Sequence, residues 1–186
     1  MSAQPAESFL PHPEEWTVDD LLALPEDQGN RIELVDGLVV VSPAPTSKHQ
    51  RVLQQLQFAF ATVVPSAYEF LPGVNVVLNN ERLLIPDLVV LNAPGVDAVY
   101  YKGSDVLLAL EIHSPSTRVF DLALKRQLYG EARIPFLMFV DPNGDVPASR
   151  LLELDGEGYR DIASSAAGVL TVNRPFPMTL DLGRPR

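Results

Sequence analysis

Two acidic residues, Asp87 and Glu111, stand at the ends of apolar runs that are typical of buried strands. Glu111 follows the run Val106 to Leu110, and Asp87 precedes the run Leu88 to Leu91. Charged side chains are rarely buried without a partner, because removing an unpaired charge from water costs several kcal/mol. A divalent cation held by both carboxylates, Mg²⁺ or Mn²⁺, would offset that cost. The alternative is that each acid pairs with a basic residue or lies at an exposed strand end.

A predicted helix after Glu111 adds three polar side chains to this region. Asp121, Lys125 and Tyr129 are spaced four residues apart, so they share one face of the helix. The simplest interpretation of Asp121 and Lys125 is a surface ion pair worth roughly a few tenths of a kcal/mol. The connection between strand and helix is short, however. The helix therefore begins beside Glu111, which brings Lys125 near enough to orient a water or stabilise a phosphate.

Three further residues carry weaker signals. His113 lies two residues after Glu111 and so points to the same side of the strand, where it could reach the same cleft. A lone histidine at a strand end is nevertheless more often a surface or hydrogen-bonding group. Glu33 lies on a predicted hairpin, where an acid on the polar side is ordinary. His49 opens a predicted helix and is by itself typical of a solvated residue in a first turn.

The elements that must position these residues are two main helices and several strands. Helices are predicted over 47–64 and 116–131, where apolar residues recur at steps of three and four, and a short helix begins after Thr17. The predicted strands are, in chain order, 31–41 (a hairpin around Asp36-Gly37), 68–78, 83–91, 106–113, 136–140, 150–154 and 159–162. This order predicts the α/β class, an α+β arrangement with a central mixed sheet flanked by helices.

The length and composition are those of one globular domain. A chain of 186 residues can bury a substantial core, and we expect a single domain over residues 15–186 after a polar, proline-rich flexible arm over residues 1–14. The sequence has no cysteine, which excludes disulfides and thiolate metal sites. Residues 1–16 lack the pattern of a secretory signal, and the longest apolar run is too short to span a bilayer. We therefore expect a cytoplasmic protein with no membrane partner.

The formal net charge of −10 counts against a generic nucleic-acid-binding surface. Binding to phosphates relies on Lys and Arg displacing counterions, and an acidic surface opposes that approach. Local charge can differ from net charge. Arg118, Lys125 and Arg126 lie close together along the chain, as do Lys48 and Arg51, so a basic rim around one cleft is compatible with the sequence.

Several segments taken together resemble the Uma-type family of endonucleases, in the PD-(D/E)xK nuclease superfamily. They follow the family's order from about residue 16 to residue 162 and so cover most of the chain. The matching segments are Thr17-Val-Asp-Asp-Leu-Leu, Arg31-Ile-Glu-Leu-Val-Asp-Gly, Ser42-Pro-Ala-Pro with His49, Ile85-Pro-Asp-Leu-Val-Val, Glu111-Ile-His-Ser-Pro-Ser-Thr, Asp121 to Tyr129 and Phe139-Val-Asp-Pro. The combination of Pro86-Asp87 with the segment that begins at Glu111 is specific, whereas a lone Pro-Asp is not. The resemblance implies a restriction endonuclease-like core.

The resemblance also implies roles for four residues. Asp87 and Glu111 would bind the metal, Glu33 would complete the acidic cluster, and Lys125 would supply the superfamily's catalytic lysine. That lysine usually lies two residues after the glutamate, where this chain has His113. The implied reaction is Mg²⁺- or Mn²⁺-dependent hydrolysis of phosphodiester bonds in nucleic acid, with DNA as the expected substrate. Nucleases of this superfamily often pair, which by analogy predicts a homodimer.

Two other functions remain open from the sequence. One is a catalytically inactive binding or assembly module on the same fold, which the net charge of −10 and the substitution at His113 favour. The retained acids Asp87 and Glu111 oppose it, because buried acids without a cation are costly. The other is a metal-dependent hydrolase that acts on a substrate other than nucleic acid, which would use the same residues.

Overall fold

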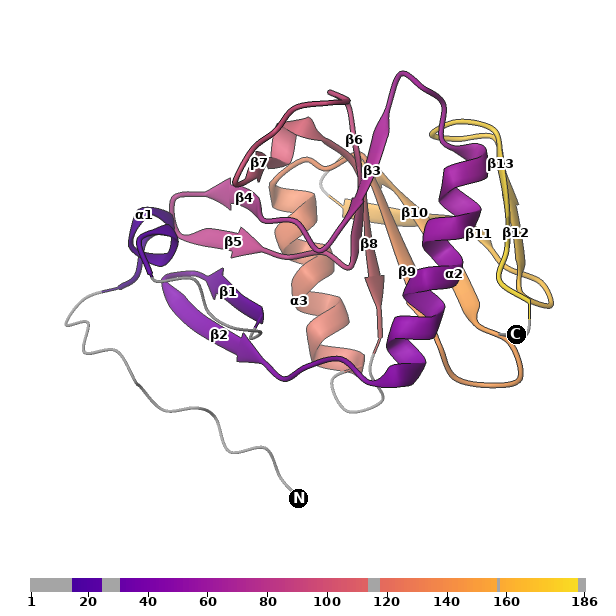
Figure 1. Cartoon of the computed structure of the whole chain (residues 1–186), viewed down its shortest axis with the longest axis horizontal. Helices are drawn as coiled ribbons and strands as arrows, with labels where there is room; N and C mark the ends of the chain where they lie inside the picture. Colours follow the sequence, from indigo (N-terminus) through magenta and orange to yellow (C-terminus); the bar gives the residue numbers. More distant parts are fainter. Residues whose placement is uncertain (1–14, 25–30, 114–117, 157, 184–186) are drawn as a thin grey trace.

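The computed structural model describes residues 15–24, 31–113, 118–156 and 158–183, and only the backbone of residues 118–121 (Figure 1). The predicted arm over residues 1–14 lies outside the described residues. In the part of the chain that is described, no helix is long and apolar enough to cross a membrane.

The chain alternates short strands with two long helices. The helices are α1 (Val18–Leu22), α2 (Ser47–Val63), the 3-10 helix η1 (Gly103–Asp105) and α3 (Arg118–Glu131). The strands are β1 (Arg31–Val35), β2 (Leu38–Ser42), β3 (Glu69–Pro72), β4 (Val76–Asn79), β5 (Arg82–Leu84), β6 (Leu88–Leu91), β7 (Tyr101–Lys102), β8 (Val106–Ile112), β9 (Phe136–Asp141), β10 (Ala148–Asp155), β11 (Gly158–Ser164), β12 (Val169–Val172) and β13 (Met178–Asp181).

Two sheets dominate the fold. The larger has the strand order β11-β10-β9-β8-β6-β3, and it is mixed because β8 and β9 run parallel while the other neighbours are antiparallel. The smaller has the order β2-β1-β5-β4-β7. Helix α3 connects the parallel pair β8 and β9, as parallel strands require a long crossover. The predicted mixed sheet with flanking helices is therefore confirmed.

Two predicted strands are wrong as continuous elements, because each is divided between the two sheets. The region 68–78 forms β3 in the larger sheet and β4 in the smaller one, and the region 83–91 forms β5 and β6 in the same way. The first break contains Gly73, whose φ of +62° is readily adopted only by glycine. The second contains Pro86, which has no N–H to donate to a ladder. The two breaks meet, since the Gly73 N–H donates to the Asp87 carbonyl.

The other predicted elements agree with the structure to within a few residues. The hairpin of β1 and β2 turns at Asp36 and Gly37, both with positive φ, as its sequence predicts. Thr17 caps α1 in a capping box with Asp20. Helix α2 begins at Ser47, but its cap is Thr46, whose side chain accepts from the His49 N–H.

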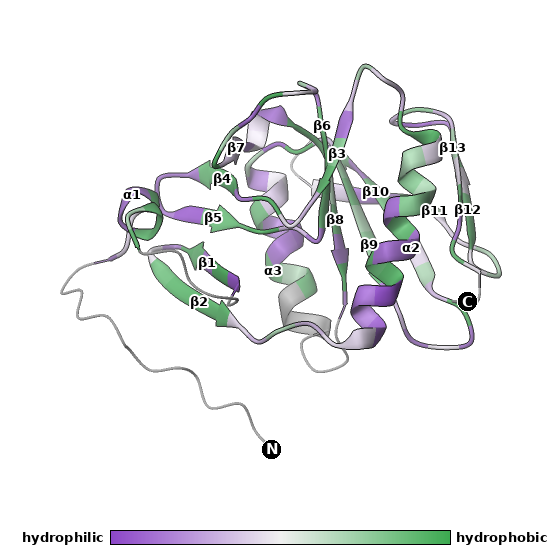
Figure 2. Cartoon of the chain, in the orientation of Figure 1, coloured by the Kyte–Doolittle hydropathy of each residue, from purple (hydrophilic) through white to green (hydrophobic). Residues whose placement is uncertain are grey.

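Helix α2 and the C-terminal hairpin cover one face of the larger sheet. Val52, Leu56 and Phe60 of α2 pack with apolar residues of β8, β9 and β13 in one core cluster. On the other face, Leu128 and Tyr129 of α3 belong to a second cluster that includes residues of both sheets. Figure 2 shows the strands of the larger sheet as largely hydrophobic and α2 as divided between polar and apolar residues along its length. Helix α3 thus packs against residues of both sheets.

The hairpin of β12 and β13 was not predicted. Its strands have only four residues each, and in both strands each buried residue is followed by a more exposed one. Such short alternating segments are weak signals in sequence, and packing against α2 decides their conformation. The hairpin is remote from the polar cluster described below and serves to cover α2.

Two phenylalanines of α2 test this packing directly. Phe60 is fully buried, whereas Phe58 is 68% exposed on the same helix. We expect Phe60→Ala to lower the free energy of unfolding by about 3–5 kcal/mol, since it leaves a cavity in the core. Phe58→Ala should change it by less than about 1 kcal/mol. Urea denaturation of both variants measures the difference, and equal losses would contradict the assignment of the α2 core face.

Candidate active site

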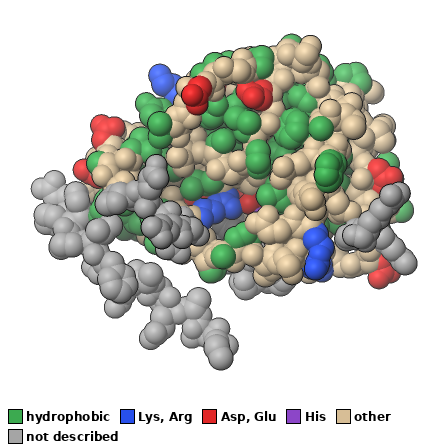
Figure 3. All heavy atoms as spheres, in the orientation of Figure 1, with side chains coloured by type: hydrophobic (Ala, Val, Ile, Leu, Met, Phe, Trp, Pro, Cys, Tyr) green, Lys and Arg blue, Asp and Glu red, His purple; other side chains and the backbone are tan. Residues whose placement is uncertain are grey.

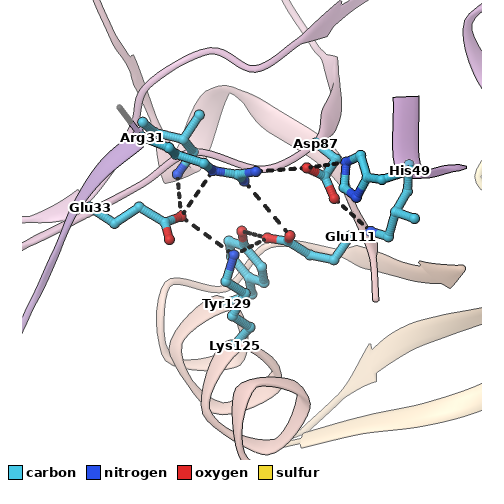
Figure 4. A network of polar contacts seen from close by, with 9 residues as sticks. Arg31, Glu33, His49, Asp87, Glu111, Lys125 and Tyr129 are labelled. Atoms are coloured by element: carbon cyan, nitrogen blue, oxygen red, sulfur yellow. Dashed lines mark hydrogen bonds and ion pairs between the residues drawn. The ribbon is translucent and has the colours of Figure 1, made fainter. Parts of the chain in front are cut away.

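Polar side chains from four elements and one connecting segment meet in one cluster, where β6 begins and β8 ends. The cluster consists of Arg31 and Glu33 from β1, His49 from α2, Asp87 before β6, Glu111 from β8, and Lys125 and Tyr129 from α3 (Figure 4). Figure 3 shows basic and acidic atoms together in a hollow near the centre of one face of the molecule. Most members of the cluster are buried, so their charges depend on one another rather than on solvent.

Asp87 lies at the point where the chain passes from the smaller sheet to the larger one. Its Oδ2 accepts a hydrogen bond from the Ile112 N–H at 2.7 Å, and its Oδ1 accepts one from Arg31 Nη1 at 2.7 Å. His49 Nε2 lies 3.3 Å from the same Oδ1. Burial raises the pKa of Asp87, but the hydrogen bond from His49 and the charge of Arg31 outweigh it and lower the pKa to about 2. Asp87 is therefore ionised in neutral solution.

Glu111 lies near the end of β8, on the face that α3 covers. Its Oε1 accepts hydrogen bonds from the Tyr129 hydroxyl at 2.6 Å and from Lys125 Nζ at 2.9 Å. Full burial raises the pKa of Glu111 to about 7, although Lys125 opposes the shift; the negative charge of Asp87 adds to it. The two acids of the pair thus have opposite shifts. Such a separation between neighbouring carboxyl groups is common in active sites.

Glu33 is buried beside α3, so the alternative of an ordinary acid on the polar side of the hairpin does not hold. Because side chains alternate along β1, Leu34 packs in the core cluster around α1 while Glu33 points to the opposite side. Glu33 Oε1 accepts from the Ile85 N–H at 2.8 Å and lies 3.4 Å from Lys125 Nζ. Lys125 is buried as well, between Glu33 and Glu111, so its interpretation as a surface residue is also wrong.

Arg31 is the member of the cluster that the sequence analysis missed. Its guanidinium group contacts all three acids: Nη1 lies 2.7 Å from Asp87, Nε lies 3.9 Å from Glu33, and Nη2 lies 3.9 Å from Glu111. One signal could have revealed it. Arg31 is two residues before Glu33 on the same strand, so both side chains must point to the same side.

The remaining candidates have different positions. His49 reaches Asp87 from the first turn of α2, so it is a member of the cluster rather than a solvated residue. Tyr129 is fully buried and donates to Glu111. The His113 ring packs on Phe139, with ring centroids 5.0 Å apart, and lines a groove of about 770 Å³ along α3. The side chain of Asp121 lies outside the described residues.

The donor set of the cluster suits a hard divalent cation. In the described part of the chain, no group of three or more acidic, histidine or cysteine side chains is arranged to hold a metal. Asp87 and Glu111, however, provide the carboxylate oxygens that Mg²⁺ and Mn²⁺ prefer, and one or two carboxylates with water suffice for Mg²⁺. The guanidinium of Arg31 already bridges these two acids (Figure 4). The pair therefore accepts a shared positive charge, which is what a metal site requires.

The opposite pKa shifts predict two pH effects on the stability of the protein in chelator. Glu111 keeps its proton in the folded state between pH 4.5 and about 7 but loses it on unfolding, so it makes stability fall as pH rises through that window. The loss is about 3 kcal/mol. Asp87, with its pKa lowered from 3.8 to about 2, contributes stability that is lost as pH falls through that interval.

Urea denaturation of Glu111→Gln and Asp87→Asn across pH 2–8 separates the two effects. Relative to wild type, Glu111→Gln should show a flatter dependence above pH 4.5, and Asp87→Asn a flatter dependence below pH 3.8. Curves parallel to that of wild type would show that neither carboxyl group titrates as its surroundings indicate.

Comparisons with known proteins agree with this architecture. A search of proteins with curated descriptions finds no match. The crystal structure of a putative nuclease belonging to DUF820 from Anabaena variabilis ATCC 29413 is similar, with a TM-score of 0.66, 16% sequence identity, and coverage of 84% of this chain and 89% of that one. At that identity the likeness shows the fold, which is restriction endonuclease-like. Residues 18–182 match the family Uma2, described as "Putative restriction endonuclease". The chain belongs to the Uma2 family.

Proposed function

We propose that this protein is a metal-dependent endonuclease that hydrolyses phosphodiester bonds of DNA. The observation that carries the proposal is the contact between Lys125 Nζ and Glu111 Oε1 at 2.9 Å, in a cluster that also contains Asp87 and Glu33. The family resemblance predicted these residue types for such a site, namely three acids and one lysine. The family membership, and the similarity to the structure described as a "putative nuclease", support the same reaction class.

In this proposal Asp87 and Glu111 hold Mg²⁺ or Mn²⁺. The bound cation would supply a Lewis acid that polarises a phosphoryl oxygen and lowers the pKa of water. Asp87 is prepared for this role because Arg31 and His49 keep it ionised despite its burial. Ile112 fixes its orientation through Oδ2, which leaves Oδ1 as the oxygen directed to cations. A rigid ligand of this kind costs little reorganisation when a cation binds.

Lys125 and Tyr129 position Glu111 and complete the chemistry. Tyr129 donates to Glu111 Oε1 from a fully buried position, so it locks the carboxyl group without entering the hollow. Lys125 contacts both Glu111 and Glu33, and an ammonium there can orient the attacking water and stabilise the charge that develops on the phosphate. Hydrolysis forms a bond from the water oxygen to phosphorus and breaks the bond from phosphorus to the leaving oxygen. The products are a phosphate monoester end and a free hydroxyl end.

The second candidate function is a catalytically inactive binding or assembly module. The net charge of −10 favours it, because an acidic protein repels the DNA backbone. The ion pairs of the cluster favour it too, since Arg31 and Lys125 already compensate the acids. The charge balance of the cluster supports the enzyme instead, because its three acids exceed the cations Arg31 and Lys125 by one negative charge, which a bound cation would offset.

A cleavage assay distinguishes the two functions. The protein is incubated with single-stranded, double-stranded and branched DNA, and with RNA, in Mg²⁺ or Mn²⁺. We expect cleavage of DNA by wild type, and a loss of about a hundredfold or more for Asp87→Asn and for Glu111→Gln, because each removes a charge that holds the cation. Glu81→Gln, at an exposed turn, is the matched control and should cleave like wild type. Absence of cleavage by wild type on every substrate would favour the inactive module.

Lys125 is tested in the same assay. Lys125→Met keeps the length of the side chain but removes its charge, and we expect kcat to fall by about a hundredfold while metal binding persists. Lys102→Met, an exposed lysine, serves as the control. A decrease confined to KM would show that Lys125 binds substrate without acting in the transition state.

The proposal includes a cytoplasmic location and assembly as a homodimer. The lack of cysteine is compatible with a reducing compartment. Strand β2 is an edge of the smaller sheet and exposes the apolar side chains Leu38 and Val40, which favours pairing with a second copy. We expect sedimentation equilibrium to give the mass of a dimer for wild type and of a monomer for Leu38→Glu. A monomeric wild type would contradict the assembly but not the enzyme.

A further inference from the structure

In the proposed reaction Arg31 only keeps Asp87 ionised and has no contact with the substrate. It is the first residue of β1, and its guanidinium lies among the acids Glu33, Asp87 and Glu111 (Figure 4). The acids are at most 8% exposed in their side chains, whereas the side chain of Arg31 is 27% exposed. Arg31 is therefore the charged member of this group that borders the opening of the hollow.

The hydrogen bonding of Arg31 is incomplete. Nη1 donates to Asp87 at 2.7 Å, but the buried atoms Nε and Nη2 have no hydrogen-bond partner among the described residues. Their nearest acidic oxygens, on Glu33 and Glu111, lie at 3.9 Å, which is an electrostatic contact and not a hydrogen bond. A guanidinium that serves only structure normally uses its fork in bidentate contacts. In Arg31, the N–H groups of Nε and Nη2 remain available to another acceptor.

The charges of the cluster do not permit Arg31 and a divalent cation in the same gap. When all three acids are ionised, they exceed the two permanent cations, Arg31 and Lys125, by one negative charge. A divalent cation between Asp87 and Glu111 would reverse that sign and would lie against the guanidinium. Two positive charges in contact repel strongly in a buried site. The acids are held by backbone and α3 contacts, so Arg31 is the group able to move.

We propose that Arg31 is the resident cation of the metal-free site, and that a divalent cation displaces its guanidinium toward the opening, where it binds the scissile phosphate. The inference rests on the proposed metal site at Asp87 and Glu111. A phosphodiester oxygen brings the negative charge that balances the cation, and the planar fork of Arg31 matches two phosphate oxygens. Arg31 thus stabilises the cluster when no metal is bound, and it binds the substrate when the metal is present.

Metal binding without substrate tests whether a divalent cation displaces the Arg31 guanidinium. Mn²⁺ is titrated into wild type, Arg31→Met and the control Arg150→Met, whose guanidinium pairs with Asp161 on the surface. Calorimetry at pH 8 gives the dissociation constants. We expect Arg31→Met to bind Mn²⁺ about tenfold or more tightly than wild type, because no cation has to leave, and the control to bind like wild type. In chelator the melting temperature of Arg31→Met should be lower than that of wild type. The rise in melting temperature on adding Mn²⁺ should be larger for Arg31→Met than for wild type.

The outcomes separate this inference from the proposed function. Equal or weaker Mn²⁺ binding by Arg31→Met, with binding by wild type, overturns the displacement and leaves the nuclease proposal intact. Absence of binding by both proteins, and by Arg31→Lys, overturns the metal site and the inference with it. Binding by Arg31→Met that Asp87→Asn abolishes in the same chain supports both.

Arg31→Lys tests the contact with phosphate and keeps the charge if Arg31→Met does not fold. A lysine can neutralise the acids but has no planar fork, so Mn²⁺ affinity should stay near that of wild type. We expect KM for DNA to rise about tenfold or more with this variant, since a bidentate contact is lost. A KM equal to that of wild type would overturn the phosphate contact.

Discussion

Burial of three carboxyl groups in one hollow is the constraint on which the rest of the structure depends. Ionised groups in a low-polarity interior are strongly unfavourable unless cations and hydrogen-bond donors surround them. Here Arg31 and Lys125 supply the charges, while Tyr129 and two backbone N–H groups supply further donors. Removing any one donor leaves a buried carboxylate that the other carboxylates repel. The cluster therefore determines how closely α3 and the β1 hairpin must approach the larger sheet.

The fold produces that approach through the way its chain changes sheets. At Gly73 and again at Asp87, the chain leaves one sheet for the other, and these two points are joined by a hydrogen bond. The crossing brings Glu33 of the smaller sheet beside Glu111 of the larger one. Helix α3, which must lie over the parallel strands β8 and β9 that it connects, then places Lys125 between them. Topology and electrostatics agree at this one position.

The same cluster shows a conflict between stability and function. If the site binds a metal as proposed, the ion pairs that stabilise the metal-free protein occupy the carboxylate oxygens that the metal would need. Active sites often retain such groups at the expense of stability, because their preorganised charges act on the transition state. The opposite pKa shifts of Asp87 and Glu111 follow from this arrangement: the acid beside Arg31 and His49 is held ionised, and the more deeply enclosed acid retains affinity for a proton.

The sequence by itself determined the elements and the identity of the unusual acids. Local periodicity places α2, α3 and most strands, because it depends on neighbours within the element. Asp87 and Glu111 could be recognised from their apolar surroundings alone, and the family resemblance supplied roles for Glu33 and Lys125. Tertiary structure alone decided that the regions 68–78 and 83–91 divide between two sheets, since strand partners lie far away in sequence. It also decided that Glu33 and Lys125 are buried and that Arg31 binds all three acids, because a side chain's charge environment is made by elements that only the fold brings together.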